Sequence, residues 1–188
     1  MSTLETRTET VAEIPDATRV DMKLEIVLVP VSDVDRAKRF YRDLGWRLDL
    51  DYTTGNDYRV IQFTPPGSEC SIMVGKNITT ASPGSLQDVH LIVADVEVAC
   101  ADLRQRGVEV SGPFHEAGGV FHHAGSRHRL RGLRARRESY ASYASFNDPD
   151  GNGWILQEVT ARLSGDVQRG DPRFTSEVVD AIRHMVDG

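Results

Sequence analysis

The sequence contains little cysteine, few aromatic residues and no long hydrophobic run. Its two cysteines, Cys70 and Cys100, are too few for a framework of several disulfides and lack a metal-binding Cys-x-x-Cys spacing. No apolar stretch approaches the ~18 residues that cross a bilayer. Residues 1–20 lack the basic start and apolar core of a signal peptide. We therefore expect a cytoplasmic protein without a membrane partner.

The remaining composition is that of an ordinary globular protein. The 188 residues are 39% hydrophobic and 27% charged, which excludes collagen-like and wholly disordered chains. The formal net charge is −6, yet residues 126–137 hold six arginines and no acid. An acidic protein with one basic loop repels phosphate over most of its surface, so we do not expect nucleic acid as a partner.

A repeated pattern organises the chain. The segment KLEIVLVPV predicts a strand, and SDVDRAKRFYRDLGW predicts a helix that is capped by Ser32 or Asp33 and ends at Gly45. The later segment HLIVADVEVACADLRQRGVEV repeats this order, with Asp95 and Gly107 in the matching positions. A repeat of strand, cap, apolar stripe and glycine stop predicts one domain made by duplication.

Each copy continues with three more predicted strands: WRLDLDY, YRVIQFT and ECSIMVG in the first, and VEVSG, SYASYASF and WILQEV in the second. DPDGN, between the last two, is a tight turn by composition. We expect modules at residues 21–80 and 85–162, the second interrupted by a loop over 113–138. A disordered arm at 1–20 precedes them, and a tail at 163–188 carries a C-terminal helix.

Three segments resemble the vicinal oxygen chelate superfamily, which includes glyoxalase I, bleomycin-resistance proteins and extradiol dioxygenases. They are VSDVDRAKRFYRDLGW, VADVEVACADLRQRGV and FNDPDGNGWILQE. The resemblance, strongest to small bacterial glyoxalase-like proteins of unassigned reaction, implies an α+β fold. In it, two tandem βαβββ modules form a cupped eight-stranded mixed sheet around a cavity, commonly in a homodimer. It also implies a small-molecule ligand and, in many members, one divalent metal such as Mn, Fe, Zn or Ni.

Metal-binding members take His, Glu or Gln ligands from the first and last strands of the modules. In the first module the matching residues are Ile26 and Ser71. Isoleucine cannot bind a metal, and serine is a poor ligand. The resemblance therefore implies an incomplete ligand set, with the alternative that no metal binds.

The second module offers better donors. Asp88 and His90 lie two residues apart on one strand face, whereas Gln157 and Glu158 lie on opposite faces of the last strand. Only one of these two side chains faces the cavity, and the sequence does not decide between Gln157 and Glu158. We take Asp88, His90 and Glu158 as the candidate metal ligands. The alternatives are a hydrogen-bonded strand histidine and a solvated aspartate.

Further candidates lie in the interruption and in SYASYASF. The segment FHEAGGVFHHAG holds three histidines in a loop long enough to form a lid or binding loop, with a solvated surface loop as the alternative. The arginines that follow either bind an anionic partner or form a solvated basic run. The candidate substrate-binding residues are His90, His122, His123, Tyr143 and Gln157.

Two functions fit these observations. One is a glyoxalase- or dioxygenase-like small-molecule enzyme, a metal-dependent lyase or dioxygenase whose ligand set is centred on His90, Glu158 and a histidine of the loop. The other is a metal-free protein that sequesters a drug-like or natural-product ligand, as bleomycin-resistance proteins do. The superfamily resemblance makes the enzyme the main expectation. Ile26 and Ser71 motivate the alternative, because they stand where metal ligands are expected.

Overall fold

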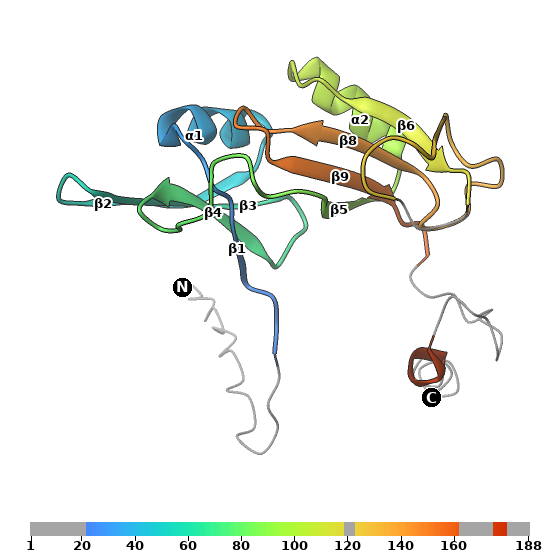
Figure 1. Ribbon diagram of the computed structural model, residues 1–188, viewed down its shortest axis with the longest axis horizontal. Helices are drawn as coiled ribbons and strands as arrows, with labels where there is room; N and C mark the ends of the chain where they lie inside the picture. Colours follow the sequence, from blue (N-terminus) through green and yellow to red (C-terminus); the bar gives the residue numbers. More distant parts are fainter. Residues whose placement is uncertain (1–21, 119–122, 162–174, 180–188) are drawn as a thin grey trace, which may run out of the picture.

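The computed structural model describes residues 22–118, 123–161 and 175–179. The elements are β1 (Ile26–Leu28), α1 (Val34–Asp43), β2 (Arg47–Thr54), β3 (Tyr58–Thr64), β4 (Ser71–Lys76), β5 (Val89–Val93), α2 (Val96–Gln105), β6 (Ser111–Glu116), β7 (Arg129–Arg131), β8 (Tyr143–Asn147) and β9 (Gly153–Glu158) (Figure 1). The predicted repeat of strand, helix and strands is confirmed. The expected arm at residues 1–20 and most of the tail lie outside the described residues. Thr175, within the described part of the tail, caps a helical turn by accepting a hydrogen bond from Val178 N.

Hydrogen bonding divides the described strands into two sheets. One has the order β1-β4-β3-β2, and the other has the order β5-β9-β8-β6-β7. The first strand of each module is parallel to the last strand of that module. The expected eight-stranded sheet is therefore replaced by sheets of four and five strands. The modules meet through side chains of one shared hydrophobic core, where Trp46 and Trp154 pack edge to face at 5.3 Å.

The two helices begin and end as the sequence predicts. Asp33 and Asp95 have extended backbones and accept hydrogen bonds from the first-turn amides of α1 and α2. Gly45 and Gly107 follow the helices with φ of 79° and 82°, a conformation that glycine adopts without strain. Both helices cover the same side of the sheets (Figure 1). Among the described residues, neither helix is long and apolar enough to span a membrane.

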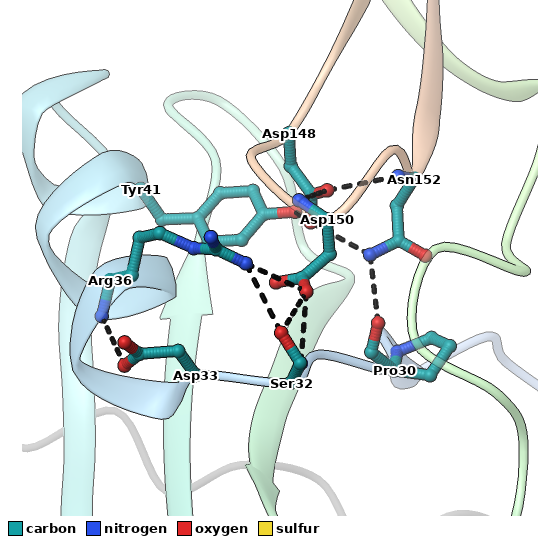
Figure 2. A network of polar contacts seen from close by, with 8 residues as sticks. All are labelled: Pro30, Ser32, Asp33, Arg36, Tyr41, Asp148, Asp150 and Asn152. Atoms are coloured by element: carbon teal, nitrogen blue, oxygen red, sulfur yellow. Dashed lines mark hydrogen bonds and ion pairs between the residues drawn. The ribbon is translucent and has the colours of Figure 1, made fainter.

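The β8–β9 turn attaches the second module to the start of α1 (Figure 2). The carboxylate of Asp150 accepts hydrogen bonds from Ser32 N at 3.0 Å and from Arg36 Nη2 at 2.9 Å. Its side chain is only 4% exposed. Burial raises the pKa of Asp150, but the hydrogen bonds from Ser32 and Arg36 outweigh it and hold the pKa below its ordinary value. The carboxylate therefore stays ionised where the modules meet.

The same turn also contacts the core of the first module. The buried Tyr41 hydroxyl donates to Asp148 Oδ2 at 2.9 Å, and Asn152 Nδ2 donates to Pro30 O at 2.9 Å (Figure 2). Burial, with the charge of Asp148, keeps the pKa of Tyr41 well above its usual value, so the phenol remains a donor. A turn to which the sequence assigns no chemistry thus joins the two halves of the fold.

Residues 113–138, which the sequence predicts as a loop, are partly strand: they begin within β6 and contain the whole of β7. Residues 113–116 belong to β6, and β7 pairs with β6 in antiparallel register. Phe114 and Glu116 alternate with a half-buried His115, as on a strand with one buried face. The interruption therefore extends the second sheet by one strand.

Candidate functional site

One face of the second sheet, opposite α2, gathers the predicted site residues. Successive strand residues point to opposite faces, and register partners share a face. Leu91 and Leu156 contribute to the shared core, so their neighbours face the other way. The register pairs His90 with Ile155, Gln157 with Tyr143, and Tyr143 with Phe114. We call this set the ligand face: His90, Phe114, Tyr143, Ile155 and Gln157.

A chain of hydrogen bonds crosses the ligand face. His90 Nδ1 lies 3.0 Å from Gln157 Oε1, and Gln157 Nε2 donates to Tyr140 O at 3.0 Å and to the Tyr143 hydroxyl at 3.3 Å. The amide oxygen is an acceptor only, so the imidazole donates from Nδ1. In the neutral ring Nε2 then carries the lone pair. Gln157 therefore fixes both the ring orientation and the tautomer of His90.

The centre of the ligand face is apolar and buried. Phe114, Tyr143 and Ile155 form a small cluster, and the Phe114 and Tyr143 rings stack at 5.7 Å. Burial, with the nearby charge of Glu116, raises the pKa of Tyr143 to about 12 against the lowering effect of Gln157. The hydroxyl is therefore a neutral donor at physiological pH. An apolar centre with a few fixed polar groups is typical of small-molecule sites.

The sequence matches the Glyoxalase/Bleomycin resistance protein/Dioxygenase superfamily over residues 23–156. The chain belongs to this superfamily. Among solved structures it is similar to TnmS3, an antibiotic binding protein from Streptomyces sp. CB03234, with 31% identity and a TM-score of 0.56 over 75% of this chain and 98% of that chain. A glyoxalase/bleomycin resistance protein from the same strain has 32% identity and a TM-score of 0.52 over 72% and 100% of the two chains.

A further superfamily member, from Sphaerobacter thermophilus DSM 20745, has 22% identity and a TM-score of 0.53 over 73% of this chain and 98% of that chain. This likeness concerns the fold alone. No curated protein matches the sequence.

The predicted metal ligands of this superfamily member do not come together. Glu158 is fully buried on the opposite face of β9, where its carboxylate pairs with Arg137 Nη2 at 2.5 Å and accepts from Val96 N at 3.0 Å. Asp88 is exposed and precedes β5 with φ of 57°. Of the candidates on the first and last strands of the module, the structure brings together His90 and Gln157.

The first module supplies no better donors. Ile26 and Ser71 are register partners on β1 and β4, and Ser71 Oγ lies 2.8 Å from Thr64 Oγ1. Over residues 22–118, 123–161 and 175–179, no group of three or more His, Cys, Asp or Glu side chains is placed to hold a metal ion. The donor set around His90 therefore does not fit the divalent metal that many superfamily members bind.

The histidines of the interruption lie at the far edge of the sheet. His123 Nδ1 is 3.1 Å from Oε2 of the fully buried Glu116, and the His123 and His128 rings lie 4.6 Å apart. His115 contacts Gly132 O through Nδ1 at 2.9 Å, and His122 is outside the described residues. The structure therefore links His123 to Glu116, two residues beyond Phe114 on β6.

Sequence reasoning missed the contribution of β6 and β7 to the site. The candidate site residues predicted from the sequence do not include Phe114, Ile155 or Arg129, although the Arg129 guanidinium lies 4.1 Å from the centre of the Phe114 ring. The alternation of Phe114 and Glu116 was the available signal. It predicts a strand with one buried face at the start of the interruption.

Proposed function

We propose that the chain binds a small, largely apolar organic ligand of the antibiotic or natural-product type on the ligand face. The observation that carries this proposal is the His90–Gln157–Tyr143 hydrogen-bond chain beside the apolar Phe114–Tyr143–Ile155 cluster. The His90 side chain is exposed and Gln157 is half-buried, so the hydrogen-bond chain presents oriented polar groups at the border of a buried apolar cluster. The similarity to TnmS3, described as an antibiotic binding protein, supports the same function.

A homodimer is part of this proposal. Large apolar side chains on the helix-free faces of both sheets are strongly exposed: Leu28 by 41%, Leu50 by 40% and Ile92 by 45%. Ile92 is the register partner of Gln157 and so adjoins the ligand face. Exposed apolar groups concentrated on one side mark an interaction surface. A second copy that covers these faces would close the site over the ligand.

Thermal unfolding with candidate ligands tests the binding function. Two probes are used. Bleomycin represents the glycopeptides, and doxorubicin represents the planar aromatic polyketides. A ligand at 100 times its dissociation constant stabilises the native state by about 2.7 kcal/mol. We expect one of these chemical classes to raise the melting temperature of the wild type and of Asp88→Asn, and to lose its effect in His90→Leu. If neither class raised the melting temperature of the wild type, the result would count against the proposal.

The second candidate is the enzyme of glyoxalase or dioxygenase type. One observation favours it. His90 Nδ1 lies 3.0 Å from Gln157 Oε1, on the first and last strands of the module. Histidine and glutamine are both residue types that serve as metal ligands in the superfamily. Elemental analysis of untagged protein, with melting curves in Mn, Fe(II), Zn and Ni, separates the candidates. Stoichiometric metal with metal-dependent stabilisation would replace the binding proposal.

We place the function in the cytoplasm. Cys70 and Cys100 are both unpaired thiols, and Cys100 is buried in the core. Unpaired thiols are usual in a reducing compartment.

A further inference from the structure

Residues of both modules line a common cleft of about 750 Å³. The first module contributes Trp46 and the β3–β4 turn at residues 65–70, and the second contributes Leu91 and Val93 on β5 with Ala99 on α2. We call this cleft, with these residues in its walls, the inter-module cleft. Pockets of roughly 300–1,000 Å³ are typical of sites for small organic molecules. The volume of the inter-module cleft therefore fits such a ligand.

Solvent reaches apolar side chains in the walls of the inter-module cleft. Leu91, Val93 and Ala99 pack against the shared core but are only half-buried. Leu24, at the border of the cleft, is 72% exposed. A molecule that enters the cleft covers this apolar surface, and that burial favours binding. The apolar contacts thus come from side chains that are already accessible.

The inter-module cleft is separate from the ligand face. Of the residues that make up the ligand face, only His90 also borders the cleft. Leu91 and Val93 alternate with His90 and Ile92 along β5, so their side chains point to the other side of the second sheet. A ligand between the modules therefore contacts a different set of side chains.

The border of the inter-module cleft carries negative charge. Its acids are Glu69 and Asp102, and no lysine or arginine is found among the described residues that line it. Asp102 is paired with Arg106 at 2.8 Å. Glu69 is exposed, and no cation lies within 4.0 Å of its carboxylate in the part of the chain that the structure describes. Nearby, burial and the charge of Glu25 together raise the pKa of the Cys70 thiol. This border therefore attracts a positive charge.

We propose that the inter-module cleft binds an aromatic organic cation, with its rings between the two modules and its positive charge toward Glu69. This inference does not depend on the proposed function of the ligand face. The rings pack against Leu91, Val93 and Ala99, and a rigid ring system loses little conformational entropy on binding. The charged group stays hydrated at the border, so its ion pair with the exposed Glu69 carboxylate is screened and adds a modest preference.

Fluorescence titration with two matched probes tests the charge preference. The probes are 9-(aminomethyl)anthracene, which is an ammonium at neutral pH, and 9-anthracenemethanol, which is uncharged. We expect wild type at low salt to bind the ammonium about threefold to fivefold more tightly, and added salt to reduce the difference. Glu69→Gln should remove most of the difference and leave binding of the alcohol unchanged. Glu109→Gln, which removes the same charge at an exposed position outside the cleft, should behave as wild type.

A pair of substitutions on α2 tests the location. Ala99 lines the inter-module cleft, and Ala101 is exposed on the same helix outside it. Ala99→Leu extends a side chain into the cleft, so we expect both probes to bind about tenfold more weakly. Ala101→Leu adds the same atoms elsewhere and should bind both probes as wild type does. Urea denaturation checks that both variants fold. If Ala99→Leu does not fold, the comparison of the two probes in wild type and Glu69→Gln still decides.

Several results would overturn the inference. Equal binding of the two probes by wild type would show that Glu69 attracts no cation, and loss of the preference in Glu109→Gln as well would reduce it to an effect of net charge. Unchanged binding in a folded Ala99→Leu would place the probes outside the cleft. Binding of neither probe would also overturn the inference, and a dimer that Ala99→Leu disrupts in sedimentation would then identify a second copy as the occupant. The bleomycin and doxorubicin melts of His90→Leu test the ligand face separately.

Discussion

Gln157 holds the ring of His90, with the amide oxygen 3.0 Å from Nδ1 and the amide nitrogen directed at Tyr143 and the backbone of Tyr140. Because one amide serves three partners, the position of the exposed imidazole depends on a half-buried side chain of the neighbouring strand. Gln157 is therefore a positioning residue for the polar end of the ligand face.

Gln157→Leu should weaken ligand binding and also cost about 1–2 kcal/mol in the free energy of unfolding. The substitution removes the hydrogen bonds that orient His90 and Tyr143, each worth about 1 kcal/mol, so we expect roughly fivefold to thirtyfold weaker binding. Isothermal titration with a ligand found by thermal unfolding measures the effect. Gln105→Ala, at an exposed position near the end of α2, is the control. Unchanged affinity in Gln157→Leu would contradict a role of the Gln157 amide in ligand binding.

Asp150→Ala should destabilise the whole domain, because the carboxylate joins the two modules. The change leaves Ser32 N without its acceptor and removes one of the two acceptors of Arg36 Nη2, the other being Ser32 Oγ. Since Arg36 is 43% exposed, solvent compensates for part of the loss, and we expect about 2 kcal/mol in the free energy of unfolding. Urea denaturation measures it. Asp57→Ala, at a side chain that is 91% exposed, should change stability little. An Asp150→Ala variant as stable as wild type would contradict the role of this turn.

The secondary structure was predictable because its signals are local. Caps at Asp33 and Asp95, glycine stops and strand alternation lie within a few residues of the features they determine, and the structure confirms those helices and most strands. The contact between Asp150 and Ser32 is different, because it joins residues far apart in the chain. A turn composition shows where a turn forms and not what the turn touches.

The site was predictable only in part, for the same reason. His90 and Gln157 were candidates from strand positions, and their contact follows from the β5–β9 register. The position of Arg129 depends on β7 pairing with β6 across the interruption, which periodicity in either strand alone does not predict. The basic run therefore suggested an exposed segment, while two of its members, Arg129 and Arg137, reach into the fold.

Acid should remove part of the stability that Asp51 supplies. Its carboxylate accepts from Arg59 Nε at 2.9 Å and from Lys38 Nζ at 2.7 Å, and the hydrogen bond with Arg59 is the main reason that its pKa falls to about 2. A folded-state pKa below the unfolded value means that this stability is complete at neutral pH and is lost as pH falls from about 4 through about 2.

The Asp51→Asn variant isolates this contribution. After allowance for solvent screening of a partly exposed pair, we expect a loss of roughly 1 kcal/mol at pH 7 and a shallower decline of stability below pH ~4 than in wild type. Denaturation curves at several acid pH values give the comparison. Asp43→Asn, at a side chain that is 62% exposed, should follow the wild-type profile. Parallel profiles for wild type and Asp51→Asn would refute the assignment.

Glu158 offers a direct choice between a structural and a metal-binding role. The structure places its carboxylate behind the sheet, between Arg137 and the first amide of α2. Arg137→Gln leaves a fully buried charge without its cation, so we expect it to lower the free energy of unfolding more than Glu158→Gln does. Glu158→Gln keeps an acceptor for Val96 N and removes the charge, so its loss should be smaller, about 2 kcal/mol.

Neither change should alter ligand affinity, because β9 separates Glu158 from the ligand face. Denaturation and titration of both variants, with Arg136→Gln as the exposed control, measure the two quantities independently. If Glu158→Gln abolished binding while stability stayed at the wild-type value, the carboxylate would have to act on the ligand. The buried ion pair with Arg137 would then not describe its role. Loss of stability with intact binding is the result that the observed geometry requires.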